Sequence, residues 1–265
     1  MENKIRIGAL ISGGGTNLQA IIDACENGRI DGRMVFVGSD VAGARGLERA
    51  ATHGIPSFVV DYKEIIHQYR ETPGQLAPPE DFDLDGLLTK QALFSHGTNP
   101  DKVRAFFTTR AVAESRLLSQ IESYQVDLLV LAGFMRNLTP YFIDRFNIDP
   151  QHPRIMNIHP ALLPSFPGVD GYGDTYRYGC KVGGCTVHFI DYGEDSGPII
   201  GQKAFPIHES DDLDAIKKKG LELEWQLYPE CIQLFAQERL HVVTMTHTLD
   251  HGQVYQRKVV RIAQR

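Results

Sequence analysis

The first sixty residues alternate between short apolar runs and segments whose apolar side chains recur at helical spacing. Residues 5–11 form a run of strand length, and residues 18–25 follow with an apolar stripe that is typical of a helix. Two further runs, 34–37 and 57–60, flank a helical segment at 42–53. This order of strand, helix, strand, helix, strand predicts an α/β protein built on a parallel, doubly wound sheet.

The alternation returns near residue 110 and continues almost to the end of the chain. We therefore predict a mostly parallel, Rossmann-like sheet with helices packed against it. In chain order, the further expected elements are a helix at 110–124, a strand at 127–132, a short helix at 139–146, strands at 154–158, 185–190 and 199–206, and a long helix at 211–237.

Two segments do not follow this rhythm. Residues 64–108 contain several prolines and the acidic stretch 80–85, which indicates an inserted, partly helical surface segment. It would serve as a lid or an oligomer contact, or be a tolerated loop excursion. Residues 241–265 contain strand-like pieces that predict a small extra sheet. We expect one domain over 1–240, with 241–265 as a C-terminal extension packed on it.

Length and charge narrow the classes of protein that the chain can represent. The 265 residues suffice for one large α/β domain or two small ones. The formal charge of −6 argues against a nucleic-acid partner, because nonspecific binding of nucleic acid needs a basic surface. The N-terminal apolar run is too short for a signal peptide, and every apolar stretch is shorter than a membrane span. We expect a cytoplasmic protein with no membrane segment.

The four cysteines do not indicate a metal centre. Cys180 and Cys185 are spaced as a ligand pair could be, but a second Cys/His pair at zinc-site spacing is missing from the sequence. We therefore expect reduced structural thiols and no bound metal.

A glycine-rich turn joins the first predicted strand to the first predicted helix. Residues 12–17 read Ser-Gly-Gly-Gly-Thr-Asn, and glycines let the backbone approach an anion that the helix amides and dipole attract. The turn is not a P-loop, because the Gly-Lys-Ser/Thr ending is missing. It is not a dinucleotide fingerprint, because Leu18 stands in place of the third glycine. It indicates either a phosphate site or a plain strand-to-helix turn.

Polar residues follow a predicted strand at the edge where open α/β sheets bind ligands. Asn157 and His159 lie two positions apart, so an extended backbone points both side chains the same way. An amide can donate to a developing oxyanion, and a histidine can exchange protons with an amine. Asp195, in a Gly-Pro turn, joins them only if the fold brings it to His159. Each residue, and His188 nearby, also has a purely structural interpretation.

Five blocks of sequence together resemble the folate-dependent formyltransferases, and among them most closely glycinamide ribonucleotide (phosphoribosylglycinamide) formyltransferase. The blocks cover residues 10–25, 46–56, 127–140, 156–168 and 183–200, in the family's order. The resemblance implies the formyltransferase fold. It also implies transfer of a formyl group from 10-formyltetrahydrofolate, as co-substrate, to the amine of glycinamide ribonucleotide in purine biosynthesis. Small molecules would then be its partners, and the protein would be a monomer or a homodimer.

The resemblance also implies residue roles. Asn157, His159 and Asp195 match the family's catalytic residues, with the first two stabilising the oxyanion and Asp195 positioning His159. The other implied contacts are Gly15, Thr16 and Asn17 for the substrate phosphate, Glu224 for the ribose hydroxyls, and Arg110, Met135, Arg136, Leu138, Ile190 and Asp191 for the folate.

Three places depart from the family pattern and bear on the alternatives. Residues 191–194 and 169–178 differ from the usual loop sequences, and Trp225 replaces a usual histidine. The alternatives are a 10-formyltetrahydrofolate hydrolase, a formyltransferase for another phosphorylated amine, and a binding protein without activity. A hydrolase usually carries an extra N-terminal domain, whereas the predicted sheet starts at residue 5. The intact catalytic residues argue against a mere binding protein.

Overall fold

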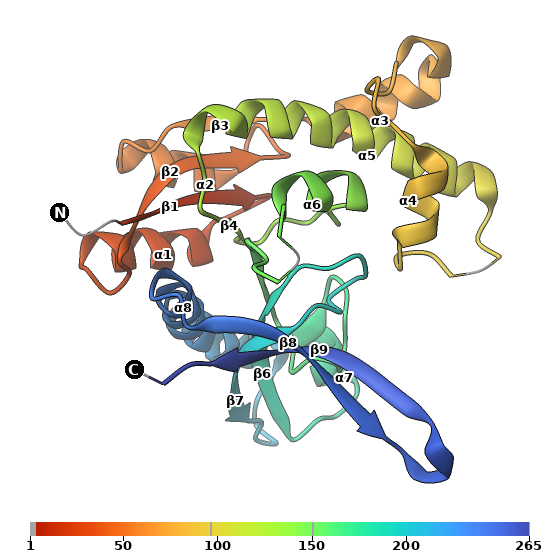
Figure 1. Ribbon diagram of the computed structural model, residues 1–265. Helices are drawn as coiled ribbons and strands as arrows, with labels where there is room; N and C mark the ends of the chain where they lie inside the picture. Colours follow the sequence, from red (N-terminus) through yellow and green to blue (C-terminus); the bar gives the residue numbers. More distant parts are fainter. Residues whose placement is uncertain (1–3, 96, 150, 265) are drawn as a thin grey trace.

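A computed structural model describes residues 4–95, 97–149 and 151–264. Its centre is a seven-stranded sheet with the order β3-β2-β1-β4-β5-β6-β7, and a separate two-stranded sheet, β8-β9, follows at the C-terminus (Figure 1). The strands are β1 (Ile5–Ile11), β2 (Gly32–Ser39), β3 (Ser57–Val59), β4 (Leu128–Leu131), β5 (Ile155–His159), β6 (Val182–Phe189), β7 (Ile199–Pro206), β8 (Leu240–Thr248) and β9 (Val254–Ile262).

Helices cover both faces of the large sheet, as the alternation of apolar runs predicts. The α-helices are α1 (Thr16–Glu26), α2 (Arg45–Thr52), α3 (Tyr62–Glu71), α4 (Leu84–Lys90), α5 (Pro100–Ile121), α6 (Pro140–Phe146), α7 (Gly171–Arg177) and α8 (Leu213–Ala236). Short 3-10 turns are η1 (Pro73–Gln75), η2 (Glu122–Tyr124) and η3 (Asp250–Gly252).

The sheet is mostly parallel, which confirms the predicted fold class. Strands β3, β2, β1, β4 and β5 run parallel to one another, and β6 pairs antiparallel with both β5 and β7. The chain runs from β1 outward to β2 and β3, and it then crosses back to β4 on the other side of β1. Such a switch point opens a crevice at the carboxyl ends of the strands, where doubly wound proteins bind ligands.

Alternate residues of each central strand pack into different layers. In β1, Ile7 and Ala9 join the cluster that contains α1 and α8, whereas Leu10 joins the cluster beneath α5 and α6. The buried hydroxyl of Tyr228 on α8 donates to the carbonyls of Leu131 and Met156, at 3.1 and 2.8 Å. These bonds fix α8 beside the ends of β4 and β5.

The predicted insertion is more ordered than its proline content suggests. Residues 64–108 include most of α3, all of α4 and the first turns of α5, which begins at Pro100 rather than near Arg110. The Asn99 side chain accepts from the amides of Asp101 and Lys102, and proline suits the first helical position. Because of this cap, Arg110 lies in the middle of a long helix. Pro78, Pro79 and residues 80–83 of the acidic stretch lie in the connection before α4, and the stretch ends in the first turn of that helix.

Two further differences concern the second half of the chain. Helix α7, over residues 171–177, was not expected, because two glycines within a single short turn mask its periodicity. The expected small C-terminal sheet is present as a long hairpin, β8 paired with β9, that extends away from the body (Figure 1). The division into a domain over 1–240 and an extension over 241–265 remains a prediction.

Candidate active site

One cavity of about 530 Å³ opens at the carboxyl ends of β1, β4 and β5. Its volume lies within the range of sites that bind small molecules. All the residues that the sequence resemblance singles out line it: Gly15, Thr16, Asn17, Arg110, Met135, Arg136, Leu138, Asn157, His159, Ile190, Asp191, Asp195 and Glu224. The fold thus gathers into one place side chains that lie more than two hundred positions apart in the chain.

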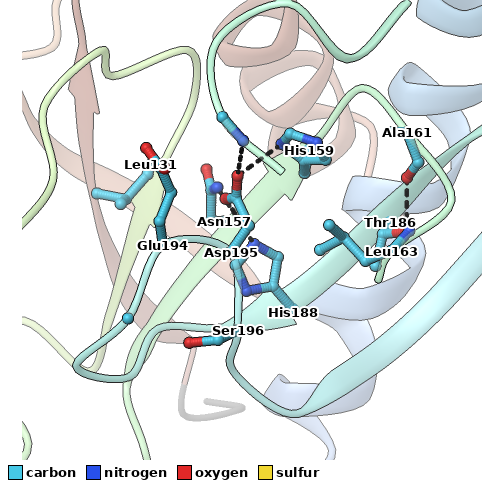
Figure 2. A network of polar contacts seen from close by, with 12 residues as sticks. Leu131, Asn157, His159, Ala161, Leu163, Thr186, His188, Glu194, Asp195 and Ser196 are labelled. Atoms are coloured by element: carbon cyan, nitrogen blue, oxygen red, sulfur yellow. Dashed lines mark hydrogen bonds and ion pairs between the residues drawn. The ribbon is translucent and has the colours of Figure 1, made fainter. Parts of the chain in front are cut away.

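His159 lies at the end of β5, and its imidazole faces Asp195 (Figure 2). Its Nε2 lies 2.7 Å from the carbonyl oxygen of Phe166, and its Nδ1 lies 3.1 Å from Asp195 Oδ2. Burial lowers the pKa of His159 below its ordinary value, while the Asp195 carboxylate and the Phe166 carbonyl act in the opposite direction. Acceptors on both ring nitrogens favour the doubly protonated ring, which can stabilise negative charge next to it.

Asp195 lies where a tight turn aims its carboxylate at two histidines. The backbone adopts a positive φ of 49° there, and the Gly168 amide donates to Oδ2 at 2.8 Å. The other oxygen lies 3.6 Å from His188 Nε2. Burial alone would raise the pKa of Asp195, but the contacts with His188 and His159 outweigh it and lower the pKa. The carboxylate is therefore ionised beside the imidazole of His159.

Asn157 faces the same group from β5, as its spacing from His159 predicts. Its Nδ2 lies 3.3 Å from His188 Nε2 (Figure 2). The other ring nitrogen of His188 donates to the carbonyl of Phe189 at 2.9 Å, and this bond fixes the ring. The buried His188 thus contacts both Asn157 and Asp195. From the sequence alone, its role could not be told from that of an ordinary core histidine.

The glycine-rich turn lines the same cavity at the start of α1. Gly15 caps the helix with φ of 69°, and a Cβ there would lie 2.8 Å from the Cα of Gly46. The side chain of Arg49 holds the turn through a 2.8 Å bond to the carbonyl of Gly14. The first residues of the helix line the cavity, and the free amides of a helix N-terminus suit an anion.

A buried carboxylate lies next to this turn. Glu224 on α8 is 4% exposed, and it accepts from Asn17 Nδ2 and from the Tyr172 hydroxyl, each at 2.6 Å. Burial raises the pKa of Glu224, and these two donors oppose that effect. Each carboxylate oxygen keeps a further acceptor direction for a ligand hydroxyl.

Two arginines, Arg110 and Arg136, also line the cavity. Arg136 Nε pairs with the buried Asp40 at 2.6 Å. The guanidinium of Arg110 lies 4.7 Å from the ring centre of Phe106 and 5.1 Å from that of Tyr62. Its buried Nε lacks a hydrogen-bond partner among the described residues. A buried cation that lacks a hydrogen bond suits an anionic group of a ligand.

The family model named "Formyl transferase" matches residues 5–232. The chain belongs to the formyl transferase family. A phosphoribosylglycinamide formyltransferase of Haemophilus influenzae is 33% identical over 89% of the chain and 90% of that relative. The solved structure of glycinamide ribonucleotide transformylase 1 of Symbiobacterium toebii matches this one with a TM-score of 0.71 and 35% sequence identity. The match covers all of this chain and 96% of that chain.

Other relatives of this formyl transferase are much longer. A trifunctional purine biosynthetic protein adenosine-3 of Chironomus tentans is 32% identical over 88% of the chain, which spans only 14% of that protein. The matched region corresponds to a single part of such a multifunctional chain.

The structure of this formyl transferase also shows a cavity residue that the sequence did not reveal. Tyr172 on α7 lines the pocket and bonds Glu224, although the two are 52 positions apart. A local pattern carries no trace of such a pairing.

Among the described residues, the helices are too short or too polar to cross a membrane, and no group of three or more His, Cys, Asp or Glu side chains suits a metal ion.

Proposed function

We propose that this formyl transferase moves the formyl group of 10-formyltetrahydrofolate to the amine of glycinamide ribonucleotide, in purine biosynthesis. The observation that carries the proposal is the single cavity that joins the anion-binding turn, the buried carboxylate Glu224 and the group of Asn157, His159 and Asp195. A substrate that has a phosphate, a ribose diol and an amine matches these three features in that order. Both substrates are small metabolites, which fits a cytoplasmic location.

On the acceptor side, the amides of Gly15, Thr16 and Asn17 bind the phosphate through backbone donors and the helix dipole. Glu224 accepts from both ribose hydroxyls. Its oxygens are already oriented by Asn17 and Tyr172, so little ordering remains when the ribose binds. This positioning directs the amine of the ribonucleotide toward His159.

At the reacting centre, the amine attacks the formyl carbon and the carbonyl oxygen becomes an oxyanion. The Asn157 amide donates to that oxygen. The positive charge of the His159 imidazolium, whose two N–H groups face Phe166 and Asp195, stabilises it electrostatically. Asp195 opposes the lowering of the His159 pKa by burial, which favours the charged ring, and it orients that ring. The attacking nitrogen loses a proton and the departing folate nitrogen gains one, so the transfer of the formyl group needs no net acid or base. Asp195 relays this proton through water.

On the donor side, the pterin ring lies along the loop that includes Ile190 and Asp191, against Leu138 and Met135. Arg110 and Arg136, which also line the cavity, bind the glutamate tail of the folate. The unpartnered Nε of Arg110 supports this assignment, because a carboxylate would satisfy it.

Incubation of the protein with 10-formyltetrahydrofolate, with and without glycinamide ribonucleotide, tests the proposal. Loss of the formyl carrier only in the presence of the nucleotide, together with formylated product, is the expected result. Loss without the nucleotide would show a hydrolase, and product from a different phosphorylated amine alone would show another acceptor. His159→Ala should abolish transfer yet retain ribonucleotide binding in calorimetry, whereas a pure binding protein would show no turnover in either form.

A further inference from the structure

The loop that carries Asp195 is bonded to Gly168 and Asn137 at the cavity, and two further parts of the chain hold it from outside. Within the loop, Asp191 Oδ1 accepts from the Ser196 hydroxyl at 2.6 Å and from the Gly193 amide at 3.1 Å. These bonds close a small ring but do not connect it to the body of the protein. Asp195 itself has a positive φ, a conformation that costs a non-glycine residue energy and persists only when its surroundings impose it.

The first outside contact comes from residues 84–95, which we call the arm and which include α4. The Ala92 amide donates to the carbonyl of Tyr192 at 2.9 Å, and Ala92 pairs with Gly193 as an isolated parallel bridge. Asp144 on α6 connects the two segments a second time. It accepts from Lys90 Nζ at 2.6 Å with one oxygen and from the Tyr192 hydroxyl with the other.

The second outside contact comes from the C-terminal hairpin. Arg257 on β9 donates through Nη2 to the carbonyl of Ser196 at 3.1 Å. Ser196 directly follows Asp195, so this bond holds the residue next to the catalytic carboxylate. The hairpin begins at Leu240 and therefore lies beyond residues 5–232, the part that the family model matches. The arm lies in the inserted segment, which the sequence resemblance does not cover.

We propose that the arm and the C-terminal hairpin together clamp the loop 190–197, and that Lys90 and Arg257 are positioning residues that keep the Asp195 carboxylate against His159. This role rests on the proposed function, in which Asp195 orients His159. The arm holds the loop on the side of Tyr192 and Gly193, and the hairpin holds it at Ser196. A shift of the loop by about an ångström is enough to weaken transition-state contacts strongly.

The proposal has a directional consequence for pH dependence. The groups that act on His159 are Asp195, His188, Glu194 and the Phe166 carbonyl, and Asp195 raises its pKa. If the loop is loosened, Asp195 moves away from His159 and the pKa of His159 falls. The alkaline limb of the pH–rate profile then moves to lower pH. Removing a positive charge near His159 without moving the loop would instead raise that pKa. The direction of the shift therefore separates positioning from a simple charge effect.

The test uses Lys90→Met, Arg257→Met and the double variant in the full-length protein. Lys102→Met and Lys258→Met are matched controls, since both lysines are exposed and their side chains make no hydrogen bond or ion pair among the described residues. We expect kcat to fall about two- to fivefold in each single variant and about tenfold in the double variant. The KM for the ribonucleotide should change less than twofold, and the alkaline limb should move to lower pH. The conservative variants Lys90→Arg and Arg257→Lys should retain most of the wild-type kcat.

Hydrogen exchange of the peptide over residues 190–197 provides a readout that needs no substrate. Faster exchange of this peptide in the double variant, with unchanged exchange in β5, supports the clamp even if the wild-type protein transfers no formyl group. In that case the proposed function fails and the clamp stands. Unchanged exchange in the double variant, or an alkaline limb that stays in place or moves to higher pH, overturns the clamp.

Discussion

The hydroxyl of Tyr172 donates a 2.6 Å hydrogen bond to Glu224, and both side chains are almost fully buried. Tyr172 lies on α7, within residues 169–178, one of the three places where the sequence is expected to depart from the family's usual pattern. Gly220, one turn before Glu224 on α8, makes room for the ring, because a Cβ at that position would lie 2.1 Å from Tyr172 Cζ. Tyrosine and glycine thus act as a pair that orients the carboxylate proposed to bind ribose.

Replacement of this tyrosine should weaken ribonucleotide binding selectively. Tyr172→Phe keeps the ring but removes a hydrogen bond to a buried carboxylate, a contact worth roughly 1.5–3 kcal/mol. The KM for the ribonucleotide should rise about 10- to 100-fold while the KM for the folate stays constant. Steady-state kinetics in both substrates measure this split. Tyr176→Phe on the exposed side of the same helix is the control, and an equal effect there would contradict the assignment.

A substitution at Gly220 should reverse the usual effect of alanine in a helix. Gly→Ala within a helix ordinarily stabilises by roughly 0.5–1 kcal/mol. Here the added methyl group overlaps the Tyr172 ring, so Gly220→Ala should lower the melting temperature and raise the KM for the ribonucleotide. Thermal unfolding and kinetics of the same preparation measure both. A stabilised variant with unchanged KM would show that the ring moves aside without consequence.

The Asp195→Asn variant should separate charge from geometry at His159. The amide can still accept from Gly168, but the negative charge is gone. The pKa of His159, already lowered by burial, should fall further, because the carboxylate is the largest influence that raises it. Turnover should fall by about 10²- to 10⁴-fold, and the alkaline limb should shift to lower pH. Histidine titration by NMR checks the direction independently, and a limb at higher pH would rule out this role.

Glu114, a buried residue outside the reacting centre, should make the free energy of unfolding depend on pH. It is fully buried and accepts from the Thr139 amide and hydroxyl at 2.8 and 2.6 Å, and burial raises its pKa to about 8. A raised pKa means that the folded protein keeps a proton that the unfolded chain releases at lower pH. The stabilisation is complete below the unfolded pKa of 4.5 and is lost as the pH rises through about 8.

Glu114→Gln should remove this dependence. Between pH 5 and 8, the free energy of unfolding of the wild type should fall relative to that of the variant, by at most about 1.4 kcal/mol per pH unit. Urea unfolding at several pH values measures the difference. The exposed Glu122→Gln is the control. Parallel curves for wild type and Glu114→Gln would show that residue 114 keeps the same charge in both states.

Much of the fold was readable in the sequence because strand and helix periodicities are local. The run at 5–11 matches β1, and the run at 199–206 matches β7, residue for residue. The two-residue spacing of Asn157 and His159 predicted that both side chains point to the same side, since alternate residues of a strand share a face. Errors occurred where local signals conflict. A proline capped by Asn99 starts α5 instead of breaking it, and glycines hide α7.

What only the tertiary structure decided are contacts between side chains distant along the chain. The approach of Asp195 to His159, the bond from Tyr172 to Glu224 and the bond from Arg257 to the Ser196 carbonyl span 36, 52 and 61 positions. Hydrophobic periodicity records which face of an element is buried, and it carries no information on which other element that face meets. Packing of the sheet and its helices sets those meetings, and with them the shape and charge of the cavity.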